Sequence, residues 1–302
     1  MRALVSGSTG FSGRFLVPAL HARGFEVYAV SQRVEAPGVR RIDLTSSAAW
    51  ASVLRELRPE HVFHLSGVAH ASTLADFAAH NTLAAAALID ATKTAKVLGA
   101  LCFVGTAAEY GLVPESRLPV DEDFPASPRT PYGATKYAQT QLALDARQRG
   151  QRVIVARPSN IIGPGMPLHT SLGNFARQLR EIELGRRPPA LEVGDLSAHR
   201  DLIDVRDVTR AYVALAADSS FSGVVNISSG EHLNMRWILG QLIRAFGVTV
   251  SVEQDPARFR TGEVSKFSAS TQLLNEAIRA RPATPLADSL RDIVAHERRV
   301  TV

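Results

Sequence analysis

The chain has 302 residues, of which 45% are hydrophobic, and this is enough to bury the core of one large domain or two unequal ones. Its formal net charge is +5, but arginines are scattered along it and no basic block carries interleaved aromatic residues, so we expect no nucleic-acid partner. No run approaches the ~20 apolar residues of a membrane span and no signal segment is visible, so we expect no membrane contact and a cytoplasmic protein.

The first expected elements are a strand at residues 3–6, a glycine-rich turn and a helix at residues 11–23. This order is the context that a dinucleotide fingerprint requires. Gly7 would make the turn, Gly10 would let a pyrophosphate approach, and Gly13 would let the helix pack close to its strand. Backbone N–H groups at the helix start would face the phosphates, and a glycine-rich turn without a ligand is the alternative. The cofactor-binding residues expected here are Gly7, Thr9, Gly10, Phe11, Ser12 and Gly13.

The second strand, at residues 26–30, bears on the type of cofactor because it ends in Ser31-Gln32-Arg33. A site that prefers NAD places an acid near this point to hold the ribose 2′-hydroxyl. Here no carboxylate would repel a 2′-phosphate and Arg33 could pair with it, so the sequence favours NADPH and leaves NADH open. An ordinary solvent-facing role for Arg33 is the alternative.

The alternation continues with a helix at 46–57, a strand at 62–65, a helix at 73–95 and a strand at 101–104. Ser66 and Gly67 would line the cofactor through their backbone, and we interpret His64 as a cap of the strand end rather than a catalyst. Cys102 is the only cysteine, and its apolar neighbours predict a buried structural thiol in a reducing compartment.

The helix expected at residues 131–149 carries Tyr132 and Lys136, which share a face because they are four positions apart. A tyrosine with a pKa of about 10 is a poor acid–base catalyst at neutral pH, and a neighbouring ammonium would lower that pKa. The spacing alone is weak evidence, since many such pairs are solvated. Helices 73–95 and 131–149 also carry alanine-rich faces, which predict either a homodimer paired through them or packing on their own sheet.

A strand at residues 152–156 completes the alternation, which predicts a parallel sheet covered by helices on both faces. The later elements expected are helices at about 171–184, 206–217, 235–246 and 286–298, and strands near 191, at 224–227 and at 248–253. The expected fold class is α/β, a Rossmann-type doubly wound parallel sheet with a smaller C-terminal α/β substrate-binding lobe. We expect residues 1–160 to bind the dinucleotide, with residues 200–230 returning to that domain, and residues 161–302 to form mostly the substrate-binding lobe.

A series of motifs follows in one order along the chain: Gly7-Gly10-Phe11-Gly13, Asp43-Leu44, His64-Leu65-Ser66-Gly67, Thr106 before Tyr110-Gly111, Tyr132 with Lys136, Arg157-Pro158 and Arg200-Asp201. In this order they resemble the extended short-chain dehydrogenases/reductases, the NAD-dependent epimerase/dehydratase family, nearly from end to end. The resemblance implies that Tyr132 donates a proton to a substrate oxygen, Thr106 hydrogen-bonds that oxygen, and Lys136 holds the nicotinamide ribose. The cofactor contacts that it implies are Asp43, Leu44, Leu65, Ser66, Gly67, Tyr132 and Lys136. Asp43 would accept from the adenine amino group, or only form a turn.

The C-terminal half is similar to nucleotide-sugar enzymes, most of all to GDP-4-keto-6-deoxy-mannose reductases, through residues 174–178, 185, 188–189, 193–196, 200–201 and 204–208. The substrate-binding residues that this resemblance implies are Asn160, Asn174, Arg177, Arg200, Arg260 and Glu263. Three alternatives stay open: Asn160 caps the turn before Gly163, Arg200 pairs with Asp201 or Asp204, and Arg177 faces water. No His, Cys and carboxylate spacing indicates a metal site.

The resemblance implies NADPH-dependent reduction of the C4 ketone of a GDP-linked 4-keto-6-deoxy sugar, giving a GDP-6-deoxyhexose such as GDP-rhamnose. Dehydration is not expected, because the family's dehydratases place acids directly after the catalytic Thr, whereas Ala107 and Ala108 follow Thr106 here. Glu109, one position later, should point elsewhere. A nucleotide-sugar 4-epimerase with tightly bound NAD, acting on a dTDP-6-deoxyhexose for example, is the alternative, and a non-catalytic NADPH-binding regulator ranks lower.

Overall fold

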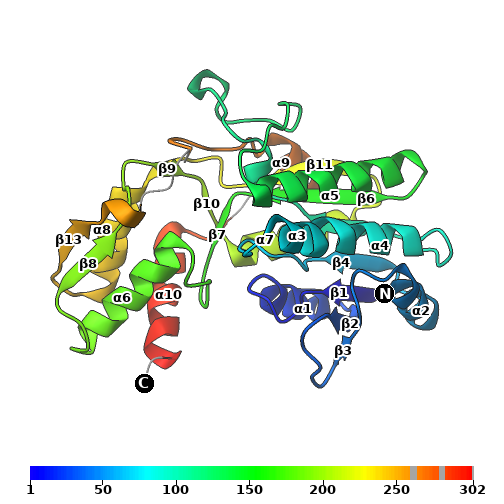
Figure 1. Ribbon diagram of the computed structural model, residues 1–302, viewed down its shortest axis with the longest axis horizontal. Coiled ribbons are helices and arrows are strands. Elements are labelled where there is room, and N and C mark those ends of the chain that lie inside the picture. Colours follow the sequence, from blue (N-terminus) through cyan, green and yellow to red (C-terminus); the bar gives the residue numbers. More distant parts are fainter. Residues whose placement is uncertain (259–263, 279–282, 301–302) are drawn as a thin grey trace.

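The computed structural model describes residues 1–258, 264–278 and 283–300. A seven-stranded sheet with helices on both faces lies beside a smaller lobe (Figure 1). The strands of this sheet, in spatial order, are β11 (Gly223–Ile227), β6 (Val153–Pro158), β5 (Leu101–Val104), β4 (His61–His64), β1 (Arg2–Ser6), β2 (Glu26–Ser31) and β3 (Val39–Arg41). All neighbouring strands are parallel, so the predicted α/β fold with a Rossmann-type sheet is confirmed.

The order of the strands reverses at β1, which pairs with β2 on one side and with β4 on the other. Ser6 lies level with Val30 on β2 and with His64 on β4, so the three strands end at the same edge. In open sheets of this kind ligands bind outside the carboxyl ends of the strands at the reversal point. The architecture therefore predicts a ligand site at this edge of the sheet.

Two hydrophobic cores cover the two faces of the sheet. Leu101 and Phe103 of β5 point into one core and Cys102 into the other, as the twofold repeat of a strand requires. The helices of the first face are α2 (Ser47–Leu57), α4 (Ala84–Ala91) and α5 (Pro131–Gln148), and those of the second are α1 (Gly13–Ala22), α7 (Val205–Ala217) and α9 (Gln272–Ile278). Because both faces are buried, the strands are apolar on both sides.

The helix predicted at residues 73–95 differs from the expectation. It consists of α3 (Leu74–Phe77), a π-helical turn η1 (Ala78–Leu83) and α4, and it ends at Ala91. The wider turn brings the buried Asn81 side chain inward, where it forms several hydrogen bonds. Nothing in the alanine-rich sequence marks such a turn, and π turns are common at functional sites.

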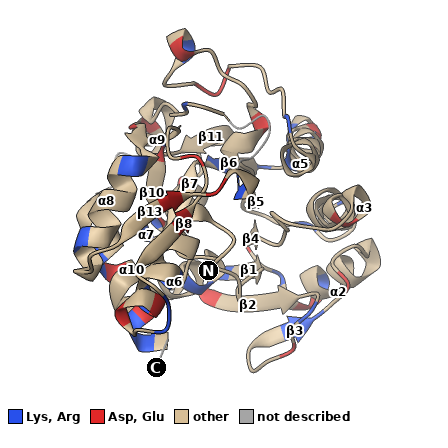
Figure 2. Cartoon of the chain, turned by 60° about the vertical axis from the view of Figure 1, so that its left-hand side comes forward, with Lys and Arg blue, Asp and Glu red and all other residues tan. Residues whose placement is uncertain are grey.

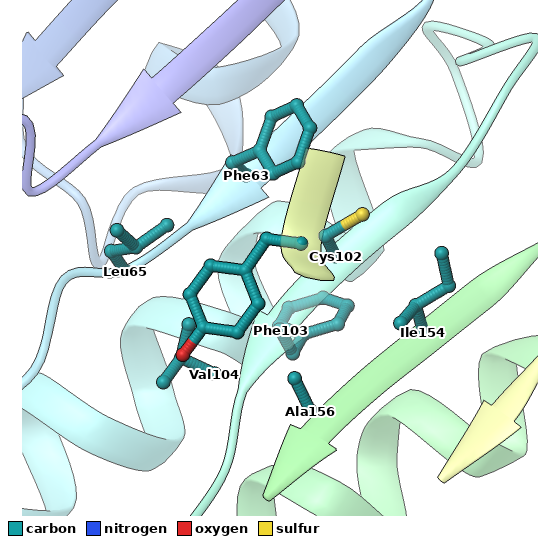
Figure 3. Close-up of a pocket in the computed structure, with 8 residues that line it drawn as sticks. Phe63, Leu65, Cys102, Phe103, Val104, Ile154 and Ala156 are labelled. Atoms are coloured by element: carbon teal, nitrogen blue, oxygen red, sulfur yellow. The ribbon is translucent and has the colours of Figure 1, made fainter. Parts of the chain in front are cut away.

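Cys102 lies against a small cavity between the sheet and α7 (Figure 3). The labelled residues around it, among them Phe63, Leu65 and Ile154, are apolar. The thiol is free and buried, and burial raises the pKa of Cys102 to about 12. The predicted structural thiol is confirmed, because a thiol with so high a pKa is not a nucleophile.

The smaller lobe has its own core, built from helices α6 (Ser171–Glu183), α8 (Met235–Phe246) and α10 (Leu286–Val300) around the parallel pair β8 (Ala190–Val193) and β13 (Ser251–Gln254). Two further strand pairs, which the sequence pattern did not predict, are β7 (Asn160–Ile162) with β10 (Leu202–Asp204) and β9 (His199–Arg200) with β12 (Leu233–Asn234). The short 3-10 helices are η2 (Ala107–Glu109), η3 (Glu115–Arg117) and η4 (Pro256–Arg258). Within the described ranges no helix has the length and apolar character that crossing a membrane requires.

Candidate active site

The start of α5 sets the position of Tyr132. Thr130 caps the helix, its hydroxyl accepting a hydrogen bond of 3.0 Å from the Gly133 N–H, and Pro131 occupies the first helical position. Tyr132 and Lys136 therefore lie in the first two turns and share one face. The helix begins at the carboxyl edge of the sheet because the loop before it follows β5.

Thr106 meets Tyr132 at that edge. It follows β5 and begins η2, where its Oγ1 accepts a hydrogen bond of 3.2 Å from the Ala108 N–H. The Thr106 hydroxyl also lies near the Tyr132 phenol, close enough to act on its pKa. Burial raises the pKa of Tyr132 above its usual value, and the Thr106 hydroxyl acts in the opposite direction. Two of the three expected catalytic side chains thus lie near each other.

Lys136 is buried beside the same site. Its Nζ donates a hydrogen bond of 2.8 Å to Gln139 Oε1, and the Gln139 amide donates one of 3.0 Å to the Val104 carbonyl. Burial lowers the pKa of Lys136 to about 8, while the nearby Glu109 carboxylate acts to raise it. The expectation that Lys136 lowers the pKa of Tyr132 is not met here, because loss of solvation dominates the pKa of the phenol.

Asn81 joins the segment after β4 to α5, a function that no sequence motif indicated. Its Nδ2 donates to the Val68 carbonyl at 3.0 Å and to Thr135 Oγ1 at 3.1 Å, and its Oδ1 accepts from the Val68 N–H at 2.8 Å. A Cβ at Gly67 would lie 2.8 Å from Asn81 Oδ1 and 3.7 Å from Lys136 Nζ. Gly67 therefore lets the chain pass directly over the lysine ammonium.

The glycine turn lies on the other side of the same segment. Gly7 has a φ of +78°, and a Cβ there would lie 2.8 Å from the Ser66 nitrogen. A Cβ at Gly13 would be 2.1 Å from the Gly7 oxygen, whereas at Gly10 the nearest atom would be 3.2 Å away. Gly7 and Gly13 are thus required by close packing. Gly10 is exposed, which leaves room for a ligand above the turn.

The other residues of the turn lie in different surroundings. The Ser8 hydroxyl is buried and has no hydrogen-bond partner in the part of the chain that the structure describes. The Phe11 side chain packs against the core of the smaller lobe, and Arg14, at the start of α1, donates to the Gly165 carbonyl at 3.0 Å. The glycine turn therefore also contacts the smaller lobe. Thr9 is exposed and Ser12 begins α1 without a side-chain cap.

His64 is part of the core. Its Nδ1 lies 2.9 Å from the Ser6 hydroxyl, and its ring packs edge-on against Trp50 and Phe103. Burial lowers the pKa of His64 to about 3, so the ring is neutral near pH 7. These contacts agree with a structural rather than a catalytic histidine.

Arg33 and Asp43 flank the end of β2. Arg33 is exposed, and its Nη2 lies 2.9 Å from His80 Nε2 in the π-helical turn. Asp43 Oδ1 accepts from the Thr45 N–H at 2.9 Å and from its hydroxyl at 2.7 Å, which is the turn-forming alternative that the sequence left open. Leu44 is buried in the core and does not face solvent.

The expected substrate residues fall into two groups. Asn160, exposed at the start of β7, donates from its Nδ2 to the Asp201 carbonyl at 3.1 Å, and Arg200 Nη1 donates to the Val264 carbonyl at 2.6 Å. The Asp201 carboxylate accepts from Ser229, Gly230 and Ala269, and Asp204 pairs with Arg206.

Asn174 and Arg177 form the second group, on α6 in the smaller lobe. Asn174 Oδ1 accepts from Gln178 Nε2 at 2.6 Å, and Arg177 Nε lies 2.9 Å from Glu297 Oε2 of α10. Both side chains thus have partners within the lobe, and Arg177 forms an ion pair rather than simply facing water. Arg260 and Glu263 lie outside the described residues.

Charged residues elsewhere in the described part of the chain are spread over several elements (Figure 2). Lys and Arg lie on several separate elements, among them α8 and β3, with Asp and Glu between them (Figure 2). Among the residues that the structure describes, no three His, Cys, Asp or Glu side chains are grouped as a metal would require. The arrangement at the carboxyl edge therefore stands as the candidate active site.

Comparison with known proteins agrees with this geometry. Residues 3–228 match the NAD dependent epimerase/dehydratase family. The GDP-6-deoxy-D-mannose reductase of Pseudomonas aeruginosa is 31% identical over 97% of this chain and 96% of its own length. The structure of RMD from Pseudomonas aeruginosa complexed with NADPH has a TM-score of 0.89 at 31% identity, and 99% of each chain is covered. The UDP-glucose 4-epimerase of Thermus thermophilus, in complex with NAD, has a TM-score of 0.86 at 29% identity, and 100% of each chain is covered.

Proposed function

The chain belongs to the NAD-dependent epimerase/dehydratase family, and we propose that it reduces the C4 ketone of a nucleotide-linked 4-keto-6-deoxy sugar with NADPH. The observation that carries this proposal is the placement of the Thr106 hydroxyl near the Tyr132 phenol, beside the buried Lys136. The similarity to a GDP-6-deoxy-D-mannose reductase supports a GDP-linked sugar and a GDP-6-deoxyhexose such as GDP-rhamnose as the product.

The residues present fit the cofactor. Gly10 leaves open space above a turn whose N–H groups begin α1, and this is the arrangement that accepts a pyrophosphate. Arg33 lies at the end of β2, where no carboxylate would repel a 2′-phosphate, and its fork geometry suits that group. The relative complexed with NADPH supports NADPH over NADH. The chemistry that a bound NADPH supplies is a hydride for the ketone carbon.

Tyr132 is assigned the proton transfer. When hydride reaches C4, negative charge develops on the ketone oxygen, and that atom is where donors are needed. A phenol whose pKa is raised by burial keeps its proton at neutral pH, as a proton donor must. Thr106, whose hydroxyl lies near the phenol, would hydrogen-bond the same oxygen, and Lys136 beside Gly67 would hold the nicotinamide ribose.

Removal of water from the sugar is not part of the proposal. Ala107 and Ala108, which follow Thr106, carry no group that exchanges a proton. Glu109, the next carboxylate, is fully buried in an ion pair with Arg157 and is turned away from solvent. A 4,6-dehydratase requires acids at these positions.

A 4-epimerase is the second candidate, because the epimerase of Thermus thermophilus has nearly the same fold and is described with NAD. An epimerase would return the hydride to the sugar and show no net use of NADPH. The two functions are distinguished by incubating the protein with NADPH and a 4-keto-6-deoxy sugar linked to GDP, dTDP or UDP. Loss of absorbance of the reduced nicotinamide, fastest with GDP, is the expected result. No loss of absorbance, together with interconversion of UDP-glucose and UDP-galactose, would overturn the reductase assignment.

A homodimer in the cytoplasm completes the proposal. Ala84, Ala85 and Ala87 are buried in the subunit's own core, so the alanine-rich face is already covered. Support for pairing comes instead from Leu74 and Leu83, which are 63% and 53% exposed on the outer surface of the same helical segment. Light scattering should give twice the chain mass, and Leu83→Glu should give a monomer. A monomeric wild-type protein would refute the pairing. The single cysteine, with no disulfide to maintain, supports the cytoplasm.

A further inference from the structure

Glu109 lies between the candidate catalytic residues and the interior of the sheet. Its side chain is fully buried, and Oε1 accepts a hydrogen bond of 3.0 Å from the backbone N–H of Thr106. Gly105 makes room for it, since a Cβ there would lie 2.6 Å from Glu109 Oε1. The carboxylate therefore holds the turn that presents the Thr106 hydroxyl.

The other oxygen of the carboxylate reaches α5. Glu109 Oε2 accepts a hydrogen bond of 2.9 Å from the hydroxyl of Thr140, which is itself fully buried. Thr140 follows Lys136 by four positions and Tyr132 by eight, so the three side chains line the same side of the helix. One carboxylate thus bridges η2, which carries Thr106, and the helix that carries Tyr132 and Lys136.

Arg157, on β6, forms an ion pair with the Glu109 carboxylate. Its Nε lies 2.9 Å from Glu109 Oε2, and its guanidinium lies 4.8 Å from the centre of the Tyr110 ring. The Tyr110 hydroxyl donates a hydrogen bond of 2.8 Å to Asn226 Oδ1 on β11. The bridge is thereby tied to β6 and β11, and a buried charge pair in such a network has little freedom to move.

We propose that Glu109 is a positioning residue for the reaction, and that it keeps the Thr106 hydroxyl near the Tyr132 phenol by clamping η2 onto α5. This inference rests on the proposed function, in which these two groups act on one oxygen of the substrate. The negative charge has a second effect. It raises the pKa of both Lys136 and Tyr132, so its removal lowers both.

Thr140→Val and Thr140→Ser test the clamp with the smallest change. Valine removes the hydroxyl that donates to Glu109, and we expect kcat to fall about tenfold or more, because small misplacements of catalytic groups are costly. The Kd for NADPH and the pH profile should stay unchanged, since neither the cofactor turn nor any charge is altered. Serine restores the hydroxyl and should keep kcat near that of the wild type. Gln141→Ala, on the exposed side of α5, is the matched control.

Glu109→Gln tests the charge. The pH profile of kcat should move to lower pH, and the pKa of Tyr132, measured by ¹³C NMR on tyrosine-labelled protein, should fall. The NMR measurement needs no turnover, so it tests the effect of the Glu109 charge on Tyr132 whether or not the proposed function holds. Normal kcat in folded Thr140→Val would overturn the inference, and so would an unshifted Tyr132 pKa in Glu109→Gln. If Glu109→Gln does not fold, Thr140→Val alone decides.

Discussion

Lys136 and Gln139 form a buried hydrogen bond of 2.8 Å within one turn of α5, from the lysine Nζ to the glutamine Oε1. The Gln139 amide is held in turn by the Val104 carbonyl at the end of β5. The glutamine therefore fixes the ammonium at the carboxyl edge of the sheet, beside Gly67 and one helical turn from Tyr132. This placement suits catalysis, but a cation without solvent destabilises the folded state.

Replacing Lys136 with Met should stabilise the protein. The folded pKa of about 8 lies below the unfolded value of about 10.4, so below pH 8 the folded state carries a charge that burial disfavours by about 3 kcal/mol. In the variant the Gln139 oxygen loses its hydrogen-bond donor, and this loss cancels about 1 kcal/mol of the gain in the free energy of unfolding. We therefore expect Lys136→Met to raise the free energy of unfolding at pH 7 by about 2 kcal/mol while it abolishes turnover.

The free energy of unfolding should depend on pH because of the lowered pKa of Lys136. Between pH 8 and pH 10.4 the unfolded chain retains a proton that folded Lys136 has lost, so this group makes the wild-type free energy of unfolding rise with pH over that window. Urea titrations at several pH values should show the rise in the wild type and in Lys96→Met, an exposed control, but not in Lys136→Met. Equal slopes in all three proteins would mean that Lys136 titrates normally.

Much of the fold follows from the sequence pattern, because long elements repeat a strong signal. Strands β1, β4 and β5 are apolar on both sides, and the alternation with helices predicts the parallel sheet. Strands of two or three residues, such as β9 and β12, have too few positions to show a period. Their existence depends on pairing between distant segments, which no local pattern reveals.

In the candidate active site too, residues in local motifs could be predicted, whereas contacts between distant segments could not. Tyr132, Lys136 and Thr106 fall in motifs, and the structure brings Thr106 and Tyr132 together. Asn81 acts only because a π-helical turn directs it toward Val68 and Thr135, residues far from it in sequence. The partners of Arg177 could not be predicted either, since Glu297 lies 120 positions away on another helix.

Gly10 and Gly13 should respond differently to substitution by alanine. At Gly13 the new Cβ would lie 2.1 Å from the Gly7 oxygen, so the turn must move, and we expect a loss of about 2 kcal/mol in the free energy of unfolding. At Gly10 the nearest atom is 3.2 Å away, so stability should stay within about 1 kcal/mol of the wild type. The methyl group would instead face the pyrophosphate and raise the Kd for NADPH about tenfold or more.

Denaturant titration and fluorescence of bound NADPH measure the two effects separately. The cofactor assignment of the turn requires that Gly10→Ala weakens binding without loss of stability. Unchanged NADPH affinity in that variant would place the pyrophosphate elsewhere.

Arg33→Ser should change the choice of cofactor. The Arg33 guanidinium is exposed at the end of β2, which is the position expected for a 2′-phosphate. Its Nη2 lies 2.9 Å from His80 Nε2. Charge-assisted hydrogen bonds are worth about 1.5–3 kcal/mol, which corresponds to a rise of about 10- to 100-fold in KM for NADPH. KM for NADH should stay the same, because NADH has no phosphate there. Arg23→Ser, on the exposed end of α1, is the control, and parallel changes for both cofactors would contradict a 2′-phosphate contact.

Tyr132→Phe removes the proposed proton donor with little change in shape. Turnover should fall about 100-fold or more, because the alkoxide then lacks its positioned acid. NADPH affinity and the free energy of unfolding should stay near the wild-type values, since the cofactor turn is untouched and the change keeps the aromatic ring at the start of α5.

Tyr137→Phe is the matched control, because it makes the same tyrosine-to-phenylalanine change five positions further along α5. Stopped-flow measurement of nicotinamide oxidation under single-turnover conditions separates the chemical step from product release. A burst of hydride transfer in Tyr132→Phe as fast as in the wild type would show that the proton comes from another group. In that case Thr106, which lies near the phenol and begins η2 at the same edge of the sheet, is the next residue to test, because its hydroxyl can also donate a hydrogen bond.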